Sequence, residues 1–556
     1  GKAMTYEKEI PDYAMLPAKE MEETLIIPVT KGAVYAPMQV TNITEKPKTT
    51  ITVEEDILVP DTKPDLAEIL MADGKATLSS REINQINKAD DYINLSGDIE
   101  LEMLYLPEKP ESCGEIISVQ TRIPFKDQWH TSLAQGACMV MECEIETIEY
   151  MVINERKYRV KVSLAIYAKE YADNKIELFE GITDEEIQTL KEKIEISNVA
   201  LRKKDTLAIH ENIAIKDECR IENILKQDIC VIENYKQVTG EKVVINGFIS
   251  VNLLYAAVCE DENSDPCALR QVSDKVEFTQ FIPISQINDE SGSCVSFDSS
   301  DLKVKLIQDE EDGEVLRLEG DLVTYIEIYR NVQREIIVDG YHREKDFICD
   351  FKEEHSRAMV GTTAGESSVR EIISPENTDG DIEKIIYTKA EISECKSTAE
   401  QGKIMTEGTI RVKMICRTHV PEPSSTGRVF SLKENIPFRI VTAMPQITGG
   451  EIICDRVCIK DFWAEKINGK QIEFNATVVI NTQVMRDVPF KIPINPAFEE
   501  KPMREEKSRM VIYITGENDS MWSIAKKFKT TMAAIQEINE LDNELIAQGQ
   551  KLLILK

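Results

Sequence analysis

The residues best suited to metal ligation or nucleophilic chemistry in this chain are its thirteen cysteines and five histidines. The closest thiols are Cys138 with Cys143 and Cys454 with Cys458. Neither pair has the C-x-x-C spacing or a second pair nearby. No histidine has a partner at the spacing of a zinc site. The histidines are His130, His210, His342, His355 and His419. We therefore interpret the cysteines as small buried hydrophobic residues rather than as ligands.

Carboxylates are the next candidates for chemistry. Asp61 and Asp65 flank Lys63 in the segment VPDTKPD (59–65), and two carboxylates at this spacing could hold a cation. The two prolines of the segment favour a structural turn instead. The sequence also lacks the G-x-x-x-x-G-K-[ST] phosphate loop and the G-x-S-x-G nucleophile elbow. We predict that the protein is not an enzyme and has no catalytic residue, no cofactor and no metal site.

Composition narrows the class of protein further. Lys and Arg number 66 against 99 Asp and Glu, so the formal net charge is −33. This excess argues against binding to nucleic acid or to an anionic membrane surface, because both need basic residues. The first 25 residues lack the apolar core of a signal peptide, and no apolar run approaches the ~20 residues of a membrane span. Scattered cysteines in odd number predict free thiols, so we expect a cytosolic protein.

Strands that recur along the chain are the elements expected to position any binding site. Apolar and polar residues alternate in three segments, as they do in half-buried strands. Each segment has a glycine at the same point, which predicts a bulge or a close backbone contact. The segments are YINLSGDIELEMLYL (92–106, Gly97), KVVINGFISVNLLY (242–255, Gly247) and KIMTEGTIRVKMIC (403–416, Gly408). The proline landmarks IPF (123–125), FIPI (281–284) and IPF (436–438) follow them in the same order. Three copies of one strand-rich domain explain this order.

The predicted fold is mainly β, with three tandem β-sandwich-like repeats followed by a small β-α-α-β domain. Ile187, Leu190 and Ile194 have helical spacing after Thr183, so a helical link between the first two repeats is expected. Polar residues 352–380 introduce the third repeat. The predicted units are a flexible N-terminus (1–24), repeat 1 (25–182), a helical linker (183–199), repeat 2 (200–345), repeat 3 (346–497), a linker (498–507) and the C-terminal domain (508–556).

Two short helices between two short strands are predicted at the C-terminal end. The strands are MVIYI (510–514) and KLLILK (551–556). The first helix has Asp519 or Ser520 as its N-cap, and the second starts at Thr530 or Thr531. Apolar residues recur at helical spacing in both. They are Met521, Ile524, Ala525 and Phe528 in the first helix, and Met532, Ile535 and Ile538 in the second.

This segment resembles the LysM family. The residues that match the family pattern are Asp519, Ser520, Met521, Trp522, Ile524, Ala525, Asn539, Gly549, Gln550 and Leu552. Asn518 and Gln548 depart from it, in place of the usual Gly and Pro. The resemblance implies a shallow groove between two loops, 516–520 and 541–547, that binds N-acetylglucosamine units. Carried onto this sequence, the partner- or glycan-binding residues are Gly516, Glu517, Asn518, Asp519, Ser520, Trp522, Leu541, Asp542, Asn543, Glu544, Leu545 and Ile546.

The repeats resemble the SPOCS family. The segment ITVEEDILVPDTKPDLAEIL (51–70) carries the most specific match, which weakens at 213–225 and is hard to find in the third repeat. Three such domains followed by LysM are similar to clostridial spore-coat morphogenetic proteins. That resemblance implies a scaffold in the mother-cell cytoplasm, at the forespore or spore-coat surface. The resemblance implies a coat morphogenetic ATPase as the partner, with LysM as a main contact. Whether the repeats also self-associate is left open. The alternative is peptidoglycan binding through the LysM groove.

Two features of the first C-terminal helix have competing interpretations. Residues 508–556 carry six basic and six acidic residues, so the net negative charge belongs to residues 1–507. The cluster of Lys526, Lys527 and Lys529 suits the C-terminal end of a helix dipole, and the alternative is a docking patch for an acidic partner. Trp522 either packs partly buried beside the apolar stripe or anchors an interface.

Overall fold

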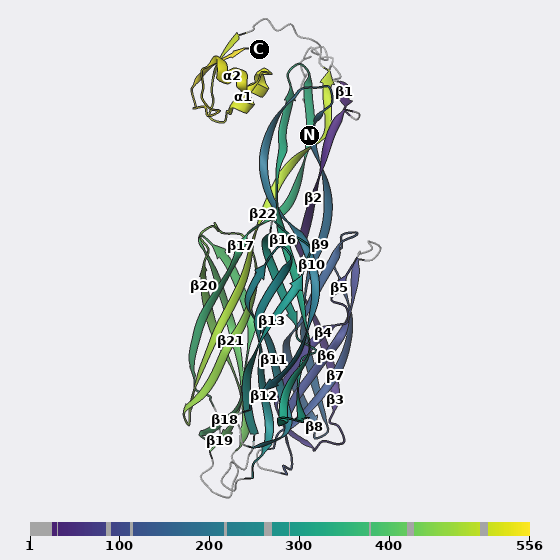
Figure 1. Cartoon of the computed structure of the whole chain (residues 1–556), viewed down its shortest axis with the longest axis vertical. Coiled ribbons are helices and arrows are strands. Elements are labelled where there is room, and N and C mark those ends of the chain that lie inside the picture. Colours follow the sequence, from purple (N-terminus) through teal and green to yellow (C-terminus); the bar gives the residue numbers. More distant parts are fainter. Residues whose placement is uncertain are drawn as a thin grey trace, which may run out of the picture.

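Two antiparallel sheets face each other in each of three consecutive repeats of the computed structural model, as the alternating strands predict (Figure 1). The structure describes residues 25–29, 32–84, 91–111, 115–215, 219–260, 269–288, 290–376, 378, 380–419, 428–500 and 510–555. The predicted flexible N-terminus, residues 1–24, lies outside these ranges. Each repeat buries one continuous apolar core between its two sheets. The predicted mainly-β, sandwich-like fold is therefore confirmed.

The strands of each repeat divide into an inner three-stranded sheet and a larger outer sheet. Repeat 1 has the inner strands β4 (Leu66–Leu78), β6 (Tyr92–Pro107) and β7 (Ile117–His130). Its outer strands are β2 (Ala33–Glu45), β3 (Thr49–Leu58), β5 (Glu82–Ile83), β8 (Cys138–Asn154) and β9 (Lys157–Ile182).

Repeats 2 and 3 follow the same plan. Repeat 2 has the inner strands β11 (Arg220–Val238), β12 (Lys242–Val258) and β13 (Leu269–Pro283). Its outer strands are β10 (Ile187–Ile213), β14 (Glu290–Asp298), β15 (Lys303–Asp309) and β16 (Gly313–His342). Repeat 3 has the inner strands β18 (Ile382–Glu400), β19 (Lys403–Thr418) and β20 (Val429–Ala443). Its outer strands are β1 (Leu25–Pro28), β17 (Asp346–Ile373), β21 (Ile452–Asn468) and β22 (Gln471–Glu500).

Six long strands continue beyond the sandwiches and form what we call the stalk, the narrow column above the three repeats in Figure 1. Each repeat contributes one two-stranded ribbon: β2 with β9, β10 with β16, and β17 with β22. The ribbons bury a shared core, so the stalk joins the three repeats. Its buried residues are Met38, Val40, Ile176, Leu178, Ile194, Ile196, Ile336, Phe490 and Ile492.

The predicted helical linker at 183–199 is wrong. Most of this segment is the start of β10, which pairs with β16 from Ile187 opposite His342 onward. Ile194 and Ile196 both point into the stalk core, which is the period of a strand and not of a helix. Local helical spacing is a weak preference, and the long pairing with β16 overrides it. Most of the polar stretch 352–380 belongs to β17, the first long strand of repeat 3. Of the predicted linker 498–507, residues 498–500 end β22, and residues 501–507 lie outside the described ranges.

The three repeat glycines share one contact that explains them. Gly97, Gly247 and Gly408 each lie opposite a phenylalanine on the neighbouring inner strand: Phe125, Phe278 and Phe438. A Cβ atom on Gly247 would lie 2.5 Å from the backbone oxygen of Ile232 and 2.8 Å from Cζ of Phe278. The predicted close backbone approach at these glycines is confirmed.

One landmark of the repeat alignment is wrong. In the first and third repeats the phenylalanine of IPF lies over the glycine, but FIPI at 281–284 is not its counterpart. Pro283 pairs with Lys242, and Phe278 holds the equivalent position over Gly247. Short apolar runs resemble one another. The alignment matched the prolines, whereas the phenylalanine ring is the group that contacts the glycine.

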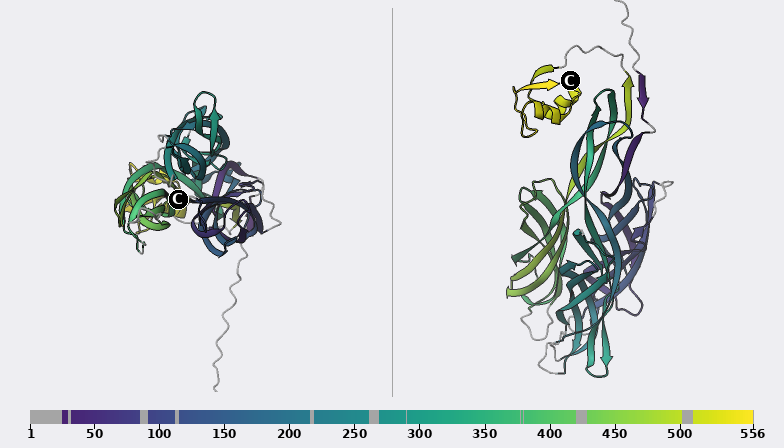
Figure 2. Two further views of the ribbon diagram at one scale, coloured as in Figure 1. Left: turned by 90° about the horizontal axis from the view of Figure 1, so that it is seen from below. Right: turned by 45° about the horizontal axis from the view of Figure 1, so that its top comes forward.

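The inner sheets of the three repeats meet around a common axis, which the end-on view in Figure 2 shows. Leu104, Leu254 and Ile415 lie at the same distance after their repeat glycines, and all three are buried in one cluster. The other members are Leu70, Met71, Ile116, Leu225, Leu269, Ile386, Tyr387 and Val429. The repeats therefore form one body around an approximate threefold axis.

Buried charges lie beside this apolar cluster, and we call them the axial charge cluster. Lys226 is 2% exposed, and its Nζ lies 2.9 Å from Asp73, 3.2 Å from Glu102 and 3.3 Å from Asp228. Burial alone would lower the pKa of Lys226, but these carboxylates raise it. Two lysines of repeat 3 complete the cluster, Lys389 and Lys413. All three repeats thus contribute charges that neutralise one another.

We expect Lys226→Met to destabilise the three-repeat body by about 3–5 kcal/mol, because it leaves the carboxylates of the axial charge cluster buried with less compensation. Urea denaturation measures the free energy of unfolding. Lys305→Met is the matched control, because Lys305 is mostly exposed in its ion pair with Glu319. The control should change the free energy by at most about 1 kcal/mol. Equal effects of the two substitutions would contradict the structural importance of the cluster.

Adding a methyl group at a repeat glycine should also destabilise the protein. We expect Gly247→Ala to cost about 1–3 kcal/mol, because its Cβ would overlap the Ile232 carbonyl and the Phe278 ring. A Cβ at Gly240, in the preceding turn, would meet only one atom at 4.0 Å. Gly240→Ala should therefore stay within about 0.5 kcal/mol in the same denaturation assay. A harmless Gly247→Ala would refute the proposed glycine–phenylalanine contact.

Candidate functional site

The C-terminal module places two helices against a two-stranded sheet, in the predicted order. The strands are β23 (Met510–Ile514) and β24 (Lys551–Leu555), and the helices are α1 (Met521–Phe528) and α2 (Met532–Ile538). Ser520 is the N-cap of α1 and Thr531 that of α2. The Ser520 hydroxyl accepts from the amide of Ser523, and the Ser523 hydroxyl accepts from the amide of Ser520. These reciprocal bonds fix where the first loop becomes helix.

Asp519 shapes the first loop of the module. Its Oδ2 accepts hydrogen bonds from the Gly516 amide at 2.7 Å and from the Tyr513 hydroxyl at 2.8 Å. The hydrogen bond from Gly516, followed by that from Tyr513, lowers the pKa of Asp519. Its carboxylate is therefore ionised at neutral pH, and it closes the loop on itself.

Thr515 joins the two predicted loops into one rim. Its hydroxyl donates to the Ala547 carbonyl and accepts from the Gln550 amide at 2.9 Å. Gln550 in turn accepts from the Ala547 amide at 2.9 Å through Oε1. Eight predicted site residues are exposed on the loops so joined: Gly516, Glu517, Asn518, Ser520, Asp542, Asn543, Glu544 and Leu545. Asp519, Leu541 and Ile546 are half-buried.

Leu545 is the most exposed of the large apolar side chains in the described part of the chain, at 81%. It follows Asn543, whose Oδ1 accepts from the Leu545 amide at 2.9 Å. An apolar side chain held out on a short, hydrogen-bonded loop is suited to contact a partner surface or the apolar face of a sugar ring.

Trp522 does not belong to this rim. It is only 8% exposed, and its ring packs against Tyr341 of β16 with ring centroids 5.0 Å apart. Its Nε1 donates to Oδ2 of Asp339 at 2.9 Å. The packing interpretation of Trp522 is therefore correct, but the packing partner lies on the stalk, far away in sequence.

Lys526, Lys527 and Lys529, at the end of α1, are interpreted either as favourable charges for the helix dipole or as a docking patch. Lys526 and Lys527 lie in the last turn of α1, as the dipole interpretation expects. Lys526 also pairs with Asp339 at 2.7 Å, and Lys529 pairs with Asp346. Two of the three lysines thus pair with acidic residues of the same chain, and a docking patch for an acidic partner stays a prediction. Lys527 instead lies over the ring of Tyr513, 4.6 Å from its centroid.

The stalk residues that meet α1 had no signal in the sequence. Asp339, Tyr341 and Asp346 lie on β16 and β17, and Leu190 on β10 packs against the same cluster. Burial opposes ionisation of Asp339, but hydrogen bonds from Lys526 and Trp522 lower its pKa overall. Only the long-range pairing of the strands brings these side chains to one place.

Among the cysteines in the described ranges, two form a disulfide that the sequence analysis missed. Cys219 is bonded to Cys259, with Cα atoms 4.7 Å apart. Cys219 precedes β11 and Cys259 follows β12, and the pairing of Arg220 with Val258 brings the two thiols together. The expectation of free thiols alone is therefore wrong. Within the described ranges, no group of three His, Cys, Asp or Glu residues could hold a metal ion.

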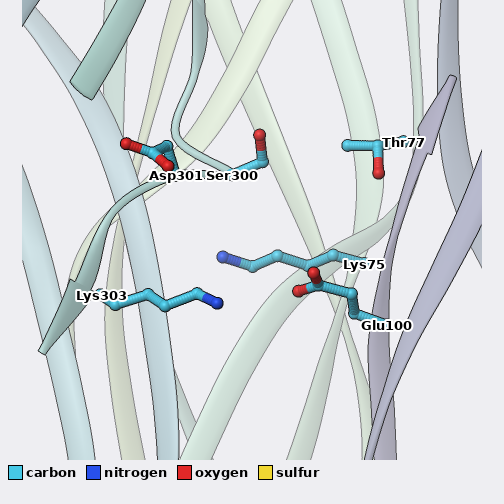
Figure 3. A pocket seen from close by; sticks show the side chains of 6 residues that line it. All are labelled: Lys75, Thr77, Glu100, Ser300, Asp301 and Lys303. Carbon is cyan, nitrogen blue, oxygen red and sulfur yellow. The ribbon is translucent and has the colours of Figure 1, made fainter. Parts of the chain in front are cut away.

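A polar crevice of about 200 Å³ lies between repeats 1 and 2. Figure 3 shows the ammonium groups of Lys75 and Lys303 pointing toward each other across it, with Glu100 and Asp301 nearby. Two positive and two negative charges balance, and the remaining lining residues are Thr77 and Ser300. Its lining thus combines hydroxyl, ammonium and carboxylate groups.

Family models identify the domains. The model described as the SPOCS domain of SipL matches residues 220–307 and 381–467, which lie in repeats 2 and 3. The model described as the LysM domain matches residues 513–555. No curated protein and no solved structure matches the chain. None of the helices in the described ranges is long and apolar enough to cross a membrane.

Repeat 1 has the same strand plan and the same glycine–phenylalanine contact as the two matched repeats. Both kinds of matched domain are binding domains without catalytic machinery. The chain therefore has SPOCS domains of the SipL type in repeats 2 and 3 followed by a C-terminal LysM domain, and this combination makes it similar to SipL.

Proposed function

We propose that this chain is a non-enzymatic scaffold of sporulation that tethers the basement layer of the spore coat to the forespore surface. In this proposal it binds a coat morphogenetic ATPase, and the LysM module is a main contact. The protein would act in the mother-cell cytoplasm, at the forespore surface. The support is the pairing of SPOCS and LysM domains, together with the surfaces that these domains leave open.

One observation carries the proposal: the three repeats use their inner faces to bind one another, while the LysM rim is exposed. The apolar cluster around the threefold axis and the axial charge cluster bury the faces of the inner sheets that meet at the axis. The module lies outside that body, beside the stalk (Figure 1), and most residues of both loops are exposed. A rigid body that carries an exposed recognition loop is the arrangement expected of a tether.

The alternative function is binding of peptidoglycan or another N-acetylglucosamine glycan. The observation that favours it is the chemistry of the rim, where exposed Asn518, Ser520 and Asn543 offer hydrogen bonds beside the apolar Leu545. Sugar recognition combines such hydrogen bonds with an apolar contact. The acidic body of the chain favours neither ligand by itself.

Removal of residues 508–556 should abolish capture of the ATPase from sporulating cells by the tagged chain. The reason is that the LysM rim provides the contact in the proposal. Mass spectrometry of the captured proteins measures the loss. The same two chains should show equal, low retention on purified peptidoglycan. Strong retention that depends on residues 508–556, without ATPase capture, would support the glycan function instead.

A single substitution locates the contact on the module. We expect Leu545→Glu in the full chain to weaken partner capture at least about tenfold, because a charge replaces an exposed apolar anchor. Ile512→Glu is the matched control, because Ile512 is 71% exposed on the outer face of β23, away from the rim. Neither side chain is buried, so both variants should fold. An effect of Ile512→Glu alone would place the contact on the strand face and contradict the rim.

A further inference from the structure

The face of α1 that carries Trp522 is covered by the chain itself. We call the covering residues the stalk tip: Asp339, Tyr341, Asp346 and Leu190. The Tyr341 hydroxyl donates to the carbonyl of Thr530, and the Tyr341 ring packs on that of Trp522. Aromatic, hydrogen-bonding and charged groups of the module each find a matching group on the stalk tip, so the contact has the features of a specific interface.

Asp339 is the centre of this contact. Its two carboxylate oxygens accept from Trp522 Nε1 at 2.9 Å and from Lys526 Nζ at 2.7 and 2.9 Å. A register shift between Leu190 and Lys191 marks a bulge in the pairing of β10 with β16 just beside it. Bulges redirect side chains, and this one lies where Asp339 and Tyr341 reach the module.

Most of the buried residues around Trp522 come from the module itself. Ile524, Ala525, Ile535, Leu552 and Ile554 are all buried within it, at 1% exposure or less. Both helices have hydrogen-bonded N-caps inside the module. The contact with the stalk instead depends on one aromatic pair and several polar bonds, which water can replace at small net cost.

We propose that this face of α1 is a recognition surface for an acidic strand tip that carries a tyrosine, and that Asp339-Gly340-Tyr341 of the same chain occupies it. An external partner of the same chemistry reaches Trp522 only by displacing the stalk tip. The exposed rim of the two loops stays accessible in both states. The inference goes beyond the proposed function and does not depend on which ligand the rim binds.

The three tryptophans of the chain provide the test. Trp129 is 8% exposed, like Trp522, whereas Trp463 is 48% exposed. Hydroxyl-radical footprinting of the full chain, read by mass spectrometry, reports the reactivity of each ring. In the unmodified chain Trp522 should react as slowly as Trp129 and several-fold more slowly than Trp463. Reactivity of Trp522 equal to that of Trp463 would overturn the proposal.

Charge reversal at the stalk tip should expose Trp522. We expect Asp339→Lys to raise its reactivity at least about threefold and to leave Trp129 unchanged. The double variant Asp339→Lys with Lys526→Asp restores the ion pair, so it should recover part of the protection. Glu319→Lys, on the same strand but outside the stalk tip, is the control and should leave Trp522 protected. Continued protection in Asp339→Lys, or equal exposure in Glu319→Lys, would contradict the proposed recognition.

Discussion

Burial of Lys226 between carboxylates of two repeats is the interaction on which the arrangement of the three sandwiches depends. Lys226 from repeat 2 contacts Asp73 and Glu102 from repeat 1, and Lys413 from repeat 3 reaches Asp73 as well. Each of these charges is costly to bury unless its partners stay in place. The charges therefore restrict how the inner sheets can slide or separate, while the surrounding apolar residues provide the attraction.

The same cluster makes the three repeats different from one another. Asp73, Asp228 and Lys389 occupy equivalent positions, opposite Glu102, Asn252 and Lys413 on the neighbouring strand. A body built from identical repeats would place like charges together at its axis, which low-dielectric burial disfavours. Divergence at these positions places opposite charges together at the axis instead. The ribbon of repeat 2 continues from this body into the stalk, where it meets the LysM module.

Local sequence patterns predicted the features of this structure that depend on residues close together in the sequence. Alternation located the inner strands, Gly97 and its two counterparts identified the repeat, and Ser520 was one of the two expected caps of α1. The wrong helical linker and the missed disulfide share a different cause, which is strand pairing over long distances. The segment at 183–199 follows β16 rather than its own helical spacing, and Cys219 meets Cys259 because β11 and β12 pair. Trp522 was correctly seen as a packing residue, but nothing in the sequence connects it to Tyr341.

The three repeats and the docked module form a single elongated body, joined by the axial, stalk and stalk-tip contacts. Small-angle X-ray scattering of the full chain in solution tests this most directly. The scattering curve calculated from the described architecture should fit the measured curve, with a narrow, elongated particle and no sign of independent segments. A curve that requires separate sandwiches moving freely, like beads on a string, would contradict the account.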